Sequence, residues 1–280
     1  MTARLFLFAA AAFLGTSTAF AQFDFGKLTK ALDKAKEITA TAKDAGKVAK
    51  GAAGIGPKEE ADIGDAVALE VIGKYGGLVR DERIMDRVNL VGRALARYSD
   101  RPERNWRFGV LASETVNAFS APDGYVFITQ GLYDLATDDE LLAGILAHEI
   151  AHITSRHALK IIERDEAFSG GTSLLTKYSG DARQVQSQVS QADPYLGPLG
   201  LGVGKIVKTL VETGFDAPTE YAADKTGHDL AALTGYAPGG LRATLVTLQS
   251  RKGDPAKVFS THPPLKERIK RLPDEPATKS

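Results

Sequence analysis

The sequence predicts an α+β fold that is mainly helical and includes a small β-sheet. Apolar residues recur at helical spacing in two early segments. In a third, later segment they occupy every side of the expected helix. Only two short segments, 107–112 and 125–129, are rich in the aromatic and β-branched residues that strands favour. The length of 280 residues, with 43% hydrophobic and 25% charged residues, is ordinary for a folded protein with a sizeable core.

Charge and cysteine content exclude several classes of function. Lys+Arg and Asp+Glu both number 35, so the chain lacks the basic excess of nucleic-acid binders, and we expect no nucleic-acid partner. There is no cysteine, which excludes disulfide scaffolds, thiolate metal sites and cysteine nucleophiles. Any metal ion would therefore be held by His, Asp and Glu, and the chain has only five histidines.

Residues 1–21 are typical of a signal peptide. Arg4 precedes an uncharged apolar run over residues 5–15, and Ala19-Phe20-Ala21 has the small-x-small pattern of a cleavage site. The run is too short to span a bilayer, which needs about 20 residues, so an uncleaved anchor is the less favoured alternative. Because no cysteine follows the run, we do not expect a lipoprotein. We expect the mature chain to be soluble in the periplasm.

Residues 22–57 form a separate extension and linker. Alanine and lysine dominate residues 23–53, where a narrow helical stripe consists mostly of alanine. This weak apolar face favours a solvated extension, and the alternative is a peripheral contact with an anionic membrane or a partner protein. Glycines and Pro57 break the pattern over residues 51–57. We therefore expect one globular domain over residues 58–280.

The first part of that domain predicts two helices followed by two strands. Apolar residues at helical spacing mark helices around residues 67–72 and 84–95. The strand candidates 107–112 and 125–129 follow, and Pro122-Asp123-Gly124 is a turn signal just before the second of them.

A capped, buried helix carries the most informative motif. Thr137 and Glu140 form a capping box, and residues 141–147 are apolar all round, which predicts burial. The helix continues into His148-Glu149-Ile150-Ala151-His152. Burying two imidazoles and a carboxylate costs free energy unless a partner compensates, and a metal ion is such a partner.

The spacing of this motif suits zinc. His148 and His152 lie four residues apart on one helical face, so both can reach one ion. Glu149 is rotated by about 100° and stands beside the ion, where it would act as a general base. On a continuous helix His157 would be turned away from the ion, and we expect it to be a polar surface or interface residue.

A catalytic zinc site takes three protein ligands, so the third must come from elsewhere in the chain. In Glu220-Tyr221-Ala222-Ala223-Asp224 the two acidic residues share one helical face, and Pro218 suits a helix start. We expect Glu220 to complete the site. We expect Asp224 to orient a ligand histidine through its other ring nitrogen.

Together these motifs resemble peptidase family M48, the gluzincin metallopeptidases that include HtpX-like proteases and CAAX prenyl endopeptidases. The resemblance rests on H-E-I-A-H and E-Y-A-A-D, and it extends to residues 117–120, 124–129, 156–157 and 260–263 and to Arg268. It covers about residues 60–272 and is strongest to the compact, exported bacterial branch. It implies a zincin-like metallopeptidase domain with one Zn²⁺ per chain.

The resemblance also implies an activity, which is zinc-dependent endopeptidase cleavage of polypeptides, chiefly misfolded or misassembled proteins of the cell envelope. Strand 125–129 resembles the edge that pairs with an extended substrate, so Tyr125, Val126 and Phe127 are candidate substrate-binding residues. Asn117 either contacts substrate or stabilises a turn.

Three further expectations concern residues around the site. His262 either stabilises the oxyanion, binds zinc as a fourth ligand in a latent form, or is structural. Residues 164–215 are too long for an inert loop and suggest a lid. His228 is expected to be structural. The competing function is a proteolytically latent, zinc-containing holdase that retains unfolded chains in the same groove.

Overall fold

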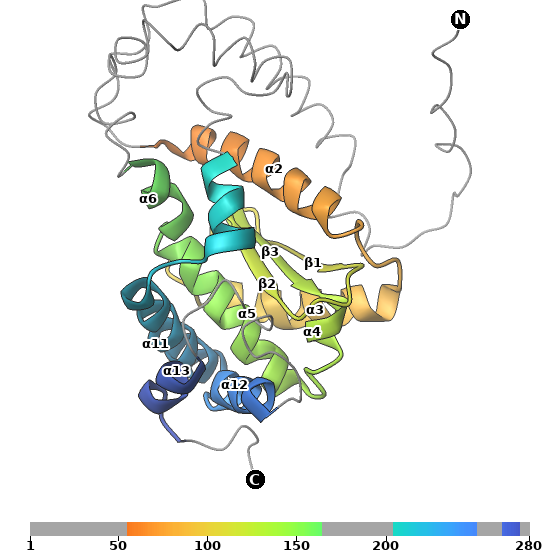
Figure 1. Cartoon of the computed structure of the whole chain (residues 1–280), viewed down its shortest axis with the longest axis vertical. Coiled ribbons are helices and arrows are strands. Elements are labelled where there is room, and N and C mark those ends of the chain that lie inside the picture. Colours follow the sequence, from red (N-terminus) through yellow and green to blue (C-terminus); the bar gives the residue numbers. More distant parts are fainter. Residues whose placement is uncertain (1–54, 164–203, 251–264, 275–280) are drawn as a thin grey trace, which may run out of the picture.

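The structure is a computed structural model, which describes residues 55–163, 204–250 and 265–274. It confirms the expected α+β architecture, because helices pack around a small three-stranded sheet (Figure 1). The expected signal peptide and the extension before residue 55 lie outside the described residues. The domain boundaries therefore stay predictions.

The helices and strands keep the labels of Figure 1. In chain order they are α2 (Pro57–Lys74), α3 (Glu82–Arg97), β1 (Arg107–Leu111), β2 (Ala118–Ala121), the 3₁₀ turn η3 (Pro122–Gly124), β3 (Tyr125–Thr129), α4 (Gln130–Tyr133), α5 (Asp139–Thr154), α6 (His157–Glu163), the π-helical turn η4 (Thr209–Thr213), α11 (Ala217–Thr234), α12 (Gly240–Ser250) and α13 (Leu265–Arg271). Within the described ranges, no helix combines the length and the apolar character that a membrane span needs.

The two expected early helices are confirmed as α2 and α3. Pro57 lies in the first turn of α2, where its missing N–H removes no helical hydrogen bond. Asp81 caps α3 by accepting hydrogen bonds from the backbone N–H groups of Arg83 and Ile84. In the core, α3 packs against β1 and α5, and α2 packs against β2 and η3.

The sheet has the strand order β1-β3-β2, with β1 parallel and β2 antiparallel to β3. The two expected strands are confirmed, but the expectation that residues 125–129 form an edge of the sheet is wrong, and their contact with substrate stays a prediction. Tyr125, Val126 and Phe127 are buried in the central strand, which is paired on both sides. The edge that packs against α5 is β2, which the sequence did not predict as a strand.

Helix α5 carries the metal-binding motif through the core. It packs against α3, α11, α12 and β2, and all its residues from Leu142 to Ile153 are buried. The expected burial is therefore confirmed. Figure 1 shows α5 between the sheet and the carboxyl-terminal helices α11, α12 and α13.

The expected capping box at the start of α5 is wrong in its details. Asp138, one residue after Thr137, is the N-cap, and its carboxylate accepts a hydrogen bond from the N–H of Leu141 at 2.9 Å. Glu140 instead accepts a hydrogen bond from the backbone N–H of Ala237. A carboxylate at the N-cap also interacts favourably with the helix dipole, which explains why Asp138 prevails over the neighbouring threonine.

A glycine lets α11 cross α5 directly at the motif. A Cβ at Gly227 would lie 2.8 Å from the backbone nitrogen of His148, too close for any side chain. Helix α11 starts at the N-cap Asp216, with Pro218 in its first turn as expected. Glu220 lies two helical turns before Gly227 and therefore shares the face that meets α5.

The chain turns sharply between α5 and α6. Helix α5 ends at Thr154, Arg156 adopts a positive φ of 57°, and α6 begins at His157. A left-handed backbone conformation cannot continue a right-handed helix. Rotation angles counted along α5 therefore do not apply to His157.

Candidate metal centre

The structure brings His148, His152 and Glu220 together inside the protein. Helix α5 supplies the histidines, α11 supplies the carboxylate, and each of the three residues is at most 3% exposed. The two Nε2 atoms are 3.1 Å apart. The carboxylate oxygens of Glu220 lie 3.5 Å from Nε2 of His148 and 3.6 Å from Nε2 of His152. The three donor groups thus face one common point.

These separations fit a single zinc-sized cation. Ligand atoms at about 2.0–2.1 Å from a tetrahedral zinc ion lie roughly 3.3 Å from one another. Charge fits as well, because the buried cluster contains the carboxylates of Glu149, Glu220 and Asp224 but only the guanidinium of Arg268 among its fixed cations in the described residues. A divalent cation would offset an excess of negative charge that is costly in a protein interior.

Asp224 and Arg268 hold the far side of His148. Asp224 Oδ1 lies 3.0 Å from Nδ1 of His148, which is the contact expected of it. Arg268, on α13, donates from Nη2 and Nε to the carboxylate of Asp224 at 2.6 Å and 2.9 Å. It is completely buried, and its Nη1 lies 3.6 Å from Glu220 Oε2. The guanidinium of Arg268 therefore orients Glu220 directly and orients His148 through Asp224.

Burial and hydrogen-bonding partners shift the pKa values of His148 and Asp224 in opposite directions. Burial and Arg268 disfavour protonation of His148, but hydrogen bonds to Asp224 and Glu220 outweigh them and raise its pKa to about 9. Burial would raise the pKa of Asp224, but His148 and Arg268 hold that pKa well below its usual range. The surroundings therefore favour positive charge beside these carboxylates.

His152 has different neighbours from His148. Its Nδ1 lies 3.0 Å from Nδ1 of His157, and the ring of Phe215 stacks on it with the ring centroids 4.6 Å apart. The expectation that His157 is a surface residue turned away from the site is wrong, because it is only 8% exposed and contacts a ligand candidate. The turn at Arg156 places it there. Burial, with a smaller contribution from Lys160, lowers the pKa of His157 to about 4.

Glu149 borders a small pocket between α5, β2 and η4. The residue is 2% exposed, and its Oε1 has no hydrogen-bond partner among the described residues. The other lining residues of the pocket are Ala118, Phe119, His152, Thr209, Leu210, Gly214 and Phe215. A carboxylate oxygen that is buried at a pocket beside a ligand histidine is well placed to act as a general base.

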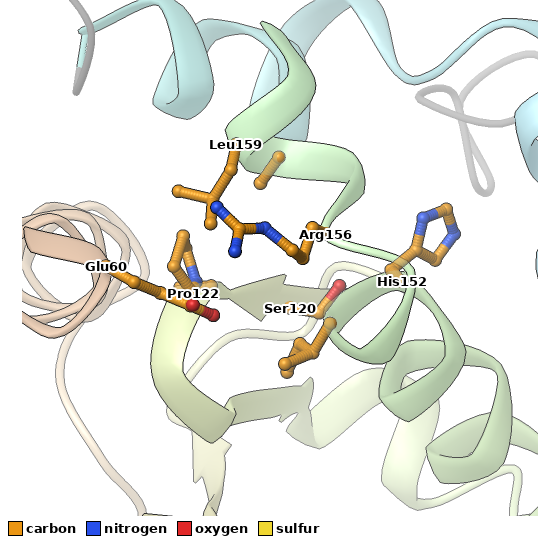
Figure 2. A pocket seen from close by; sticks show the side chains of 9 residues that line it. Glu60, Ser120, Pro122, His152, Arg156 and Leu159 are labelled. Carbon is orange, nitrogen blue, oxygen red and sulfur yellow. The ribbon is translucent and has the colours of Figure 1, made fainter. Parts of the chain in front are cut away.

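A second small pocket borders the other flank of His152 (Figure 2). Figure 2 shows Glu60, Ser120 and Arg156 around it, with the ring of His152 directed away from its centre. Glu60 is engaged in a bidentate ion pair with Arg101 at 2.7 Å and 2.8 Å. This pocket therefore belongs to the packing behind the metal centre.

The remaining expected site residues either lie outside the described residues or contact their own neighbours in the sequence. His262 and residues 164–203 of the expected lid lie outside the described residues. Asn117 Oδ1 accepts a hydrogen bond from the N–H of Ala118 at 3.0 Å, which fits the structural alternative, and its contact with substrate stays a prediction. Nδ1 of His228 lies 3.2 Å from Asp229 Oδ1.

Three residues of this site were not placed in it from the sequence, although Arg268 is among the residues that carry the family resemblance. Phe215 and Arg268 reach it through the packing of distant elements, which local spacing does not reveal. For His157 the only signal was the Arg156-His157 pair after the motif, and the assumption of a continuous helix obscured it.

The comparisons with known proteins agree with this geometry. The sequence profile of Peptidase family M48 matches residues 83–275, more than half of the chain. Metalloprotease YcaL of Escherichia coli (strain K12) is 27% identical over 220 residues, covering 78% of this chain and 76% of YcaL. Metalloprotease LoiP of the same organism is 28% identical over 168 residues, covering 60% of this chain and 61% of LoiP.

A third relative from that strain, the beta-barrel assembly-enhancing protease, is 24% identical over 209 residues, covering 73% of this chain. The chain spans 41% of that protein's length, and less than two thirds of LoiP. The profile match, with His148, His152 and Glu220 gathered at one buried point, shows that the chain belongs to peptidase family M48 and is a metalloendopeptidase.

Proposed function

We propose that this metalloendopeptidase uses zinc and cleaves misfolded or misassembled cell-envelope proteins after export to the periplasm. The observation that carries the proposal is the separation of 3.1–3.6 Å among the facing donor atoms of His148, His152 and Glu220. Two imidazoles and one carboxylate are a ligand set of catalytic zinc in proteases, with a further position open.

In the proposed mechanism His148, His152 and Glu220 hold the metal, and Glu149 moves the proton. A bound zinc ion supplies Lewis acidity, which activates water near neutral pH and polarises the scissile carbonyl. Glu149 accepts a proton from the attacking water as general base and then donates it to the leaving amine. The buried position of Glu149 keeps bulk water from competing for that proton.

Strand β2 supports binding of an extended polypeptide. Its inner side pairs with β3, and Ala118 and Phe119 line the same pocket as Glu149. The outer backbone groups of β2 are the proposed partners of substrate, the role that the sequence assigned to residues 125–129, and all four residues of β2 are buried in the structure. Backbone pairing tolerates many side chains, as an enzyme acting on unfolded chains requires.

The proposed location and substrates rest on the sequence and on one relative. Residues 1–21 combine Arg4, an apolar run and an Ala-Phe-Ala cleavage pattern, which is typical of export. The name of the beta-barrel assembly-enhancing protease refers to the assembly of β-barrels. Chains that have not yet assembled expose unpaired backbone, and an edge strand such as β2 would bind them.

Metal removal tests the proposed function. We expect the purified protein to contain one zinc ion per chain and to degrade unfolded casein, because the ligand set is complete. Dialysis against a chelator should remove the zinc and abolish degradation, and added zinc should restore both. A sample dialysed without chelator is the control. Casein degradation that persists after the zinc is gone would contradict the proposal.

A further inference from the structure

We propose that His157 is a positioning residue of the metal centre. Its Nδ1 accepts a hydrogen bond from the Nδ1–H of His152 and thereby holds His152 in the tautomer whose Nε2 faces His148 and Glu220. This inference rests on the proposed function in one respect, since it requires that His152 binds a metal.

Only one proton fits between the facing Nδ1 atoms of His152 and His157. The two Nδ1 atoms are 3.0 Å apart, and the two rings meet edge to face with centroids 4.9 Å apart at 75°. Nε2 of His152 must offer its lone pair to a metal, so the ring proton of a neutral His152 sits on Nδ1. The facing Nδ1 of His157 must then be the acceptor, with its own proton on Nε2.

An imidazole acceptor suits this side of the site better than a carboxylate. His148 already has Asp224 at its Nδ1, and the cluster also contains Glu149 and Glu220. A further carboxylate would add negative charge to a buried group of three. A neutral His157 fixes the tautomer of His152 without adding charge.

The surrounding structure keeps His157 in place. Arg156, in its left-handed conformation, donates from Nη2 to the carbonyl oxygen of Ile55 at 2.8 Å and to Glu163 at 3.2 Å. These contacts tie the start of α6 to the segment before α2. Phe215 stacks on His152 with an interplanar angle of 18°, so the ring plane of the ligand is supported as well.

The experiment compares zinc dissociation constants, measured by competition with a chromophoric chelator. His157→Leu removes the acceptor while retaining bulk, and we expect zinc binding to weaken by roughly 10- to 100-fold. His157→Asn places an amide oxygen at the position of Nδ1, and we expect it to restore most of the affinity. Arg93→Leu, at an exposed position on α3, is the matched control and should bind like wild type.

The outcomes separate this inference from the proposed function. Failure of the wild-type protein to bind zinc would reject the proposed function itself. Tight binding by wild type together with equally tight binding by His157→Leu would overturn the role of His157. If the His157→Leu protein does not fold without zinc, His157→Gln replaces it. The amide of glutamine lies one bond further from the backbone than that of asparagine, so its oxygen does not take the position of Nδ1. Equal affinities of the Asn and Gln variants would then overturn the inference.

Discussion

Replacing Glu149 by Gln is expected to lower the rate of casein cleavage by roughly 10²- to 10⁴-fold, because glutamine cannot accept the proton of the attacking water. The side chain keeps almost the same volume, and Glu149 is not among the grouped ligand residues, so the zinc content should stay that of wild type. Cleavage is measured by the release of soluble peptides, and zinc by elemental analysis of the same samples.

Glu70→Gln is the matched control for this variant, because Glu70 is exposed on α2, and it should cleave at the wild-type rate. The variant also separates the protease from a holdase. A holdase would keep casein from aggregating and would support cell function equally well with Glu149→Gln. Undiminished cleavage by Glu149→Gln would remove Glu149 from the mechanism.

Replacing Arg268 by Met is expected to destabilise the zinc-free protein by about 3–5 kcal/mol. Arg268 is completely buried and is the guanidinium partner of Asp224 and Glu220. Methionine fills much of the space but leaves those carboxylates without that cation. The free energy of unfolding is measured by urea denaturation after chelator treatment, because bound zinc would add its own stabilisation.

Arg271→Met on the same helix is the control for Arg268→Met. Arg271 is exposed, with its guanidinium 4.1 Å from the ring centroid of Tyr221, so its loss should cost no more than about 1 kcal/mol. Arg268→Lys keeps the charge but loses the bidentate geometry, and we expect an intermediate effect. Equal stability of the Arg268→Met and Arg271→Met proteins would show that the buried ion pair does not hold the site together.

Local spacing predicted much of the fold and the central ligand group. Apolar periodicity located α2, α3 and the buried α5, and the four-residue intervals from His148 to His152 and from Glu220 to Asp224 placed each pair on one helical face. These features depend on residues close in sequence, where helix geometry alone decides which side chains meet.

The wrong expectations concern features that depend on the direction of the chain after a turn or on which strands lie side by side. β2 has no β-branched residue, and its pairing with β3 is what makes it a strand. All five residues of β3 are buried, a pattern typical of a central strand, which the expectation of an edge overlooks. His157 was misplaced because the left-handed Arg156 ends the helical count.

The central claim is that Glu220 completes a zinc site with His148 and His152, and zinc binding by Glu220→Gln tests it most directly. The amide has almost the same size as the carboxylate but carries no charge and is a much poorer ligand. We predict one zinc ion per chain for wild type and loss of most of that zinc from Glu220→Gln under identical conditions, with the variant still folded. Zinc bound to Glu220→Gln with wild-type stoichiometry and affinity would contradict the claim, because the third ligand would then lie elsewhere.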